Sequence, residues 1–161
     1  MDERTEISTR SGFQAAIREA VDRAAARGAR ELCFVDDTFA DWPLNEIAIV
    51  DRLTHWAGAQ RRLVVLARRY DEVVRRHPRW VQWRRTWAHV VQCRAASVEA
   101  NEAPLQSLLL AQGVRTVWLV DPLRHRGFAS SDPADALRWR EPLDALLQRS
   151  EEAFGATTLG L

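Results

Sequence analysis

The fold class of this chain is decided by residues 105–120, which read Leu105-Gln-Ser-Leu-Leu-Leu-Ala-Gln-Gly-Val-Arg-Thr-Val-Trp-Leu-Val120. Two strand-sized apolar runs, Leu105–Ala111 and Val114–Val120, flank the pair Gln112-Gly113. Glycine suits a tight turn because it adopts backbone conformations that cost other residues free energy. The stretch therefore predicts a β-hairpin, and a sheet that contains it must have some antiparallel strands.

Upstream of the hairpin, helical and strand patterns alternate. The predicted elements are, in order, a helix over 11–27 that ends at Gly28, a strand over 31–35, a helix over 45–57, a strand over 63–67, a helical region divided at Pro78 and a strand over 89–93. Strands that alternate with helices favour right-handed crossovers and parallel pairing. The run at 63–67 is apolar throughout, which is typical of a strand covered on both faces.

Downstream of the hairpin, residues 121–131 are expected to form a long irregular connection. Asp132 and Pro133 then suit the cap and first turn of a last helix that ends near Phe154. Pro142 is expected to kink or divide that helix, because proline removes a backbone donor.

The complete order is therefore α-β-α-β-α-β-β-β-α. It predicts one α/β domain over residues 1–161, with three α/β/α layers around a mixed, mainly parallel sheet. The polar residues 1–10 and the tail 155–161 are expected to be mobile.

The composition excludes several chemistries. All 23 basic residues are arginines, so the chain has no lysine for a P-loop or a Schiff base. Two cysteines and four histidines leave little material for a structural zinc site, and no cofactor is expected. Cys33 and Cys93 lie in apolar runs, which predicts buried free thiols in a reducing compartment. The acidic start resembles no secretory signal, and no apolar run approaches the roughly 20 residues of a membrane helix, so we expect a cytoplasmic protein.

Three segments carry a resemblance to a known fold. They are the acidic stretch from Phe34 to Leu44, the strand and basic helix from Leu63 to Arg85, and the hairpin with its Ser131-Asp-Pro133 continuation. In this succession the chain resembles half of a phospholipase D-type fold, and it is similar to proteobacterial domains of unknown function of this size.

The resemblance implies a chain that has lost the catalytic signature of that fold. Active relatives carry His-x-Lys-x-x-x-x-Asp on the first hairpin strand, where the histidine attacks phosphorus and the lysine neutralises the phosphate. Aligning the turn glycine with Gly113 places Leu105, Ser107 and Gln112 at these three positions. The resemblance therefore implies a catalytically silent protein. It also suggests a homodimer, because single-half enzymes of this type pair two copies.

The most strongly charged part of the chain is the segment 61–94. It contains ten arginines and only two acidic residues, Asp71 and Glu72, which gives it a net charge of +8. Trp80, Trp83 and Trp87 interleave with these arginines, as in proteins that bind single-stranded nucleic acid or another polyanion. The candidate anion-binding residues are Arg68, Arg69, Arg75, Arg79, Arg84 and Arg85. Two other interpretations stay open, because the tryptophans share one helical stripe typical of a core, and the arginines can pair with an acidic protein surface or with the acidic remainder of the chain.

Three carboxylates suggest an alternative function. Asp36 and Asp37 follow the first predicted strand, at the sheet edge where ligands bind in α/β proteins, and Asp121 follows the last strand. Together they predict a metal site in a phosphoryl-handling enzyme, and Asp121 with His125 suggests an acid/base pair. The structural interpretation of Asp36 and Asp37 is that one of them caps the loop and the other is solvated.

Overall fold

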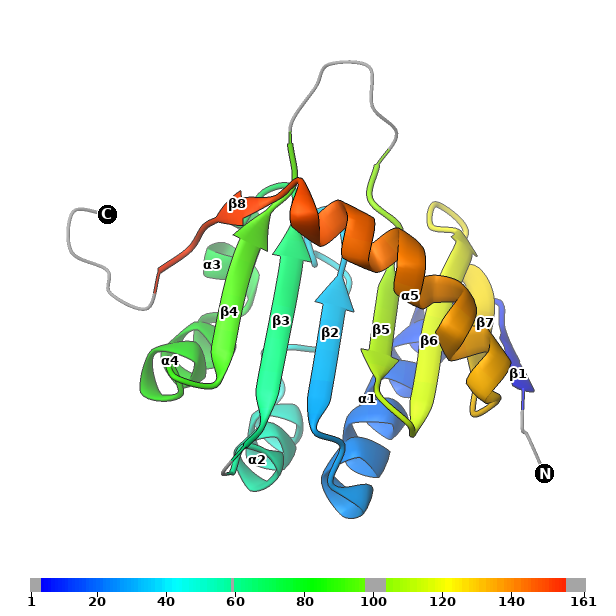
Figure 1. The fold of residues 1–161 in the computed structure, drawn as a ribbon, viewed down its shortest axis with the longest axis horizontal. Coiled ribbons are helices and arrows are strands. Elements are labelled where there is room, and N and C mark those ends of the chain that lie inside the picture. The colour runs from blue at the N-terminus through cyan, green and yellow to red at the C-terminus, as the bar shows by residue number, and fades with distance from the viewer. Residues whose placement is uncertain (1–3, 59, 98–103, 156–161) are drawn as a thin grey trace.

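The computed structural model describes residues 4–58, 60–97 and 104–155, which form one twisted sheet with helices on both faces (Figure 1). The strands in these residues pair in the order β1-β7-β6-β5-β2-β3-β4-β8. The strands are β1 (Arg4–Ile7), β2 (Glu31–Val35), β3 (Arg62–Ala67), β4 (Val91–Ala95), β5 (Leu108–Ala111), β6 (Arg115–Asp121), β7 (Arg126–Ser130) and β8 (Glu151–Glu152). The helices are α1 (Arg10–Arg27), α2 (Ile47–Trp56), α3 (Asp71–Arg76), α4 (Pro78–Thr86) and α5 (Pro133–Gln148).

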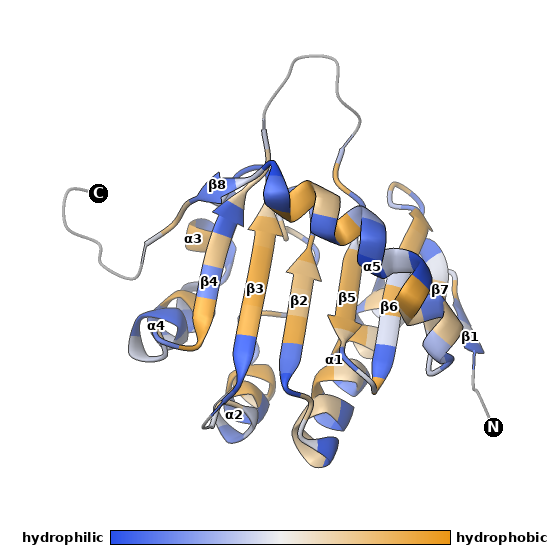
Figure 2. Ribbon diagram, viewed as in Figure 1, coloured by the Kyte–Doolittle hydropathy of each residue, from blue (hydrophilic) through white to orange (hydrophobic). Residues whose placement is uncertain are grey.

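The three-layer α/β/α architecture and the mixed sheet are confirmed. Helices α1 to α4 cover one face, and α5 crosses the other (Figure 1). Strands β2, β3 and β4 run parallel, whereas β5 pairs antiparallel with both β2 and β6. The parallel part thus consists of three neighbouring strands and is smaller than the sequence predicts. Figure 2 shows that β2, β3 and β5 are mostly hydrophobic along their length. Because such strands have apolar side chains on both faces of the sheet, helices cover both faces.

Helix α1 forms as its sequence predicts, although it begins one residue earlier. The Thr9 hydroxyl caps it by accepting from the Gly12 backbone N–H at 2.9 Å, and Gly28 ends it with a φ of 69°. Its buried face consists of the predicted apolar set, Phe13, Ile17, Ala20, Val21 and Ala24. This face packs against α2 and against strands β5 and β6 of the sheet.

Three strands differ from the predicted order. Residues 4–7, expected to be mobile, form β1 and pair antiparallel with β7. Strand β7 itself lies in the expected irregular connection. Helix α5 runs continuously through Pro142 but ends at Gln148, and Glu151–Glu152 then form β8 beside β4. Of the tail expected to be mobile, Gly155 is described and residues 156–161 lie outside the described residues.

The tryptophan stripe of α4 belongs to the core. Trp80 and Trp83 are buried, and Trp87 is half-buried against the same hydrophobic cluster. Cys33 and Cys93 are buried free thiols, as predicted. Within the described part of the chain, no helix is both long enough and apolar enough to cross a bilayer.

Candidate functional site

Asp36 organises the turn that leaves the carboxyl end of β2. Its carboxylate accepts backbone hydrogen bonds from Thr38 at 3.2 Å and Phe39 at 2.7 Å, and a third from the Ser107 hydroxyl at 2.5 Å. Phe39 takes a φ of 62°, which a non-glycine residue adopts only where its surroundings enforce it. Asp36 therefore ties the β2 turn to the start of β5, which confirms the structural interpretation for this residue.

Asp37 is engaged in the same way by protein groups. Its Oδ1 lies 3.1 Å from the Nε atom of Arg68, whose side chain is 10% exposed, and it accepts a hydrogen bond from the Leu105 backbone N–H at 3.1 Å. Arg68 was a candidate for an exposed anion site. Instead, the Arg68 side chain is mostly covered, and its charge balances the carboxylate of Asp37.

A small pocket of about 100 Å³ opens between these turns. Asp36, Asp37, Asp41, Ser107 and His125 supply its polar lining. The Nε2 atom of His125 lies 3.0 Å from Asp41, and Arg10 pairs with the same carboxylate at 3.2 Å. His125 has a φ of 53°, a second strained residue at this pocket. The sequence offered no signal for the Asp41–His125 contact, because the partners are 84 residues apart.

The three predicted metal ligands are not brought together. Asp121 pairs with the exposed Arg124 at 3.2 Å and does not line the pocket of Asp36 and Asp37. His125 bonds to Asp41 and not to Asp121. In residues 4–58, 60–97 and 104–155, no group of three or more His, Cys, Asp or Glu side chains has the arrangement of a metal site.

The pocket also lies where the resemblance places the catalytic histidine and lysine. Leu105 and Ser107 line it, and three aspartates surround them. Phosphoryl-transfer sites present cations and N–H donors to the negatively charged phosphodiester, whereas Arg68 and Arg10 at this pocket are paired with Asp37 and Asp41. At these two positions the chain therefore lacks the histidine and the lysine of the signature, and the polar lining of the pocket includes His125 and Ser107.

The predicted anion-binding arginines separate into two groups. Arg69, Arg75, Arg79 and Arg85 are exposed, whereas Arg68 is mostly covered and Arg84 is buried. Arg75 and the neighbouring Arg76 both bond to Glu72 at 2.7 Å. The hydrogen bond from Arg76 is the main cause that lowers the pKa of Glu72, and this acid therefore remains charged among the arginines.

His77 fixes the basic helices to the acidic turn. It lies between α3 and α4, is buried, and its Nε2 donates to the Phe39 carbonyl at 2.7 Å. Burial is the main cause that lowers its pKa below the ordinary value. The folded protein therefore holds a neutral imidazole at this junction.

This lowered pKa predicts a pH-dependent stability. The unfolded chain binds a proton at His77 as the pH falls through about 6.5, while the folded chain resists protonation. The stability due to neutral His77 is thus present above that pH and is lost as the pH falls below it. We expect a lower urea midpoint at about pH 5.5 than at about pH 7.5, and a smaller difference in the His77→Asn variant. An equal pH dependence in the two proteins would contradict this role.

Comparisons with known proteins show similarity in structure alone. No family model matches the sequence, and no curated protein matches it. Among solved structures, Nuc from Salmonella typhimurium, a phospholipase D family member, is 9% identical with a TM-score of 0.63, over 95% of this chain and 99% of that one. NucT from Helicobacter pylori is 7% identical with a TM-score of 0.60, over 95% of this chain and all of that one.

A third similar structure belongs to a DNA-binding protein. TrmBL2, described as an archaeal chromatin protein with a novel mode of DNA binding, is 10% identical with a TM-score of 0.65. The match covers 93% of this chain but only 54% of TrmBL2, so this chain spans about half of that protein's length. Identities this low establish the architecture and leave the activity open. The chain has a phospholipase D-like fold.

Proposed function

We propose that this protein is a non-catalytic module that binds nucleic acid through the exposed arginines around α3 and α4. The observation that carries the proposal is the exposure of Arg69, Arg75, Arg79 and Arg85 at the surface of a segment with a net charge of +8. Guanidinium groups bind phosphates through several N–H donors, and displacement of condensed counterions favours such binding.

The absence of lysine and the residues at the signature positions support a binding role over a hydrolytic one. Leu105 and Ser107 stand where a nucleophile and a phosphate-neutralising cation are needed. The carboxylates of Asp36 and Asp37 already accept bonds from protein donors. This engagement also disfavours the alternative of a metal-dependent phosphoryl-handling enzyme, because a cation would have to displace these partners.

The similar structures supply a precedent for the proposed partner. One of them is described as a chromatin protein that binds DNA, and the phospholipase D-like fold is therefore compatible with nucleic-acid binding. The buried tryptophans leave base stacking to other groups, so we expect contacts with phosphates and little sequence preference.

The proposal predicts a salt-sensitive complex with single-stranded DNA. We expect the double variant Arg79→Ala with Arg85→Ala to bind about tenfold more weakly at low salt. The slope of log K against log salt should also decrease by about 0.7 for each lost phosphate contact. Fluorescence anisotropy with a labelled oligonucleotide over a range of salt concentrations measures both quantities.

A matched control removes two positive charges from a surface outside the segment 61–94. Arg27 and Arg30 are exposed at the far end of α1, and the double variant Arg27→Ala with Arg30→Ala should retain most of the affinity. Equal losses in the two double variants would show that net charge alone matters, and binding that does not change with salt would refute the proposal. Retention of an acidic protein but not of DNA would assign the surface to a protein partner.

A further inference from the structure

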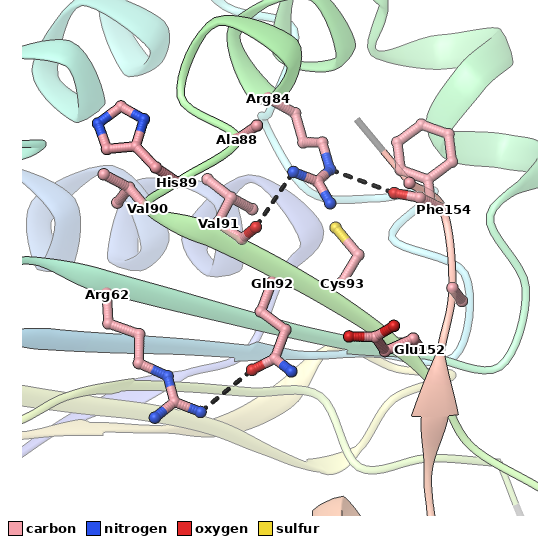
Figure 3. A pocket seen from close by; sticks show the side chains of 12 residues that line it. Arg62, Arg84, Ala88, His89, Val90, Val91, Gln92, Cys93, Glu152 and Phe154 are labelled. Carbon is pink, nitrogen blue, oxygen red and sulfur yellow. Dashed lines mark hydrogen bonds between the residues drawn. The ribbon is translucent and has the colours of Figure 1, made fainter. Parts of the chain in front are cut away.

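A second pocket, of about 690 Å³, lies beside the outer edge of β4 (Figure 3). Strand β8 pairs only with Arg94 and Ala95 of β4, so the earlier part of that edge borders the pocket. The opposite wall is formed by residues 152–155, which follow α5. This pocket shares no residue with the acidic pocket at the end of β2.

The guanidinium of Arg84 forms the buried end of this pocket. Arg84 is 6% exposed and reaches the pocket from α4. Its Nη1 donates to the Val91 carbonyl at 3.1 Å and its Nε to the Phe154 carbonyl at 3.2 Å. In Figure 3 the remaining nitrogen points away from both carbonyls, toward Cys93. The Cys93 thiol is a third partner of this guanidinium, and because burial raises the pKa of that thiol to about 11, all three partners are neutral. No carboxylate of the described residues forms an ion pair with Arg84.

The other deeply placed arginines differ in this respect. Arg115, which is 3% exposed, pairs with Glu19 at 3.3 Å, and Arg68 pairs with Asp37. A buried cation without a counter-charge carries a large desolvation cost, and carbonyl dipoles offset only part of it. The structure thus presents a buried positive charge whose compensation is incomplete, at the wall of an accessible pocket.

The rest of the lining suits an organic anion. His89 lines the pocket, and Arg62, which donates to Gln92 at 3.1 Å, lies across β4 from Arg84 (Figure 3). Val90 and Phe154 also line the pocket, and the Phe154 ring stacks on Tyr70. Glu152 also lines the pocket without an ion pair to Arg84 or Arg62, and it is free to accept a hydrogen bond from a ligand. A volume of this size with a few polar groups is typical of small-molecule sites.

We propose that this pocket binds a small organic anion whose carboxylate or phosphate group contacts Arg84. The oxyanion of the ligand supplies a negative counter-charge, which Arg84 lacks among the protein's own groups. The hydrogen bonds to the two carbonyls hold the guanidinium in place before the ligand binds. This site is separate from the exposed arginines around α3 and α4, so neither proposal depends on the other.

Inorganic phosphate and acetate are suitable first probes, because they separate the two head-group chemistries. At constant ionic strength, with chloride as the balancing anion, we expect at least one of them to raise the melting temperature in a saturable manner. Isothermal titration calorimetry should give a single site. The absence of binding by both anions would overturn the proposal.

Two variants test the position of the site. We expect Arg84→Gln to abolish the rise in melting temperature. Gln92→Glu is isosteric, keeps a partner for Arg62 and adds a negative charge to the pocket lining across β4 from Arg84, so it should weaken binding severalfold. Gln112→Glu makes the same change at the exposed β5–β6 turn and should leave binding unchanged.

The variants also separate this site from the proposed nucleic-acid surface. If Arg84→Gln fails to fold, Gln92→Glu and its control decide the question. Anion binding of equal affinity in Gln92→Glu and in the unaltered protein would show an adventitious ion only and refute the site. The variant Arg79→Ala with Arg85→Ala should keep the small-anion response, and Gln92→Glu should keep its affinity for single-stranded DNA.

Discussion

Replacing Gly127 with alanine is expected to cost about 4 kcal/mol or more of the free energy of unfolding. Gly127 lies in β7, where it pairs with Leu119 of β6 next to an irregularity in the register. A Cβ atom at this position would lie 1.9 Å from the Trp118 carbonyl oxygen and 2.7 Å from the Leu119 Cα. Both obstacles are backbone atoms, so the clash can be relieved only by separating β6 from β7. Urea denaturation monitored by tryptophan fluorescence measures the loss.

Gly58→Ala is the matched control for this substitution. A Cβ at Gly58 meets no described atom within 4 Å, so we expect a change within about 0.5 kcal/mol. A comparably small change for Gly127→Ala would mean that β7 does not approach β6 this closely. Loss of β7 would also release β1, whose register Arg4↔Ser130 to Ile7↔Gly127 depends on it.

Replacing Asp36 with alanine is expected to destabilise the protein by about 3 to 5 kcal/mol. The carboxylate accepts three hydrogen bonds, from two backbone N–H groups and the buried Ser107 hydroxyl, and hydrogen bonds to a charged group contribute about 1.5–3 kcal/mol each. Its removal also leaves the strained turn at Phe39 without support. Thermal denaturation followed by circular dichroism measures the effect.

Asp121→Ala serves as the comparison for Asp36. The carboxylate of Asp121 accepts from the side chain and the backbone N–H of the exposed Arg124, and an ion pair in contact with solvent contributes little to stability. If the two aspartates had a common role as metal ligands, both variants should instead lose a stabilisation by Mg²⁺ or Mn²⁺. Nearly equal effects on stability without metal would contradict the structural role that we assign to Asp36.

Much of the fold was predictable because its main elements are local patterns. The buried face of α1 recurs at helical spacing, β3 is apolar throughout, and Gly113 takes a φ of 76° in the expected turn. Strands β1 and β8 carry no such pattern. Only Ile7 is buried in β1, and β8 consists of two glutamates. Both form because a partner strand that is remote in the chain supplies their hydrogen bonds.

The sequence predicted which residues are candidates for the functional sites, but not whether each is buried or which groups it contacts. The adjacent aspartates could be placed at the end of β2 from sequence, yet the bond from Asp36 to Ser107 spans 71 residues. Arg84 and Arg85 are neighbours in one basic helix, and only the packing of α4 decides that the first is buried and the second is exposed. Helical rotation places successive residues about 100° apart, so neighbours can face the core and the solvent.

By itself, the sequence determined the alternation of helices and strands, the hairpin, the missing histidine and lysine, and the charge of the segment 61–94. These properties depend on residue type and on spacing within a few turns of chain. The tertiary structure decided which arginines reach solvent, which carboxylates are already occupied, and that Arg84 lines a pocket without a counter-charge. Those outcomes depend on contacts between residues far apart in the chain, and such contacts exist only once the sheet has assembled.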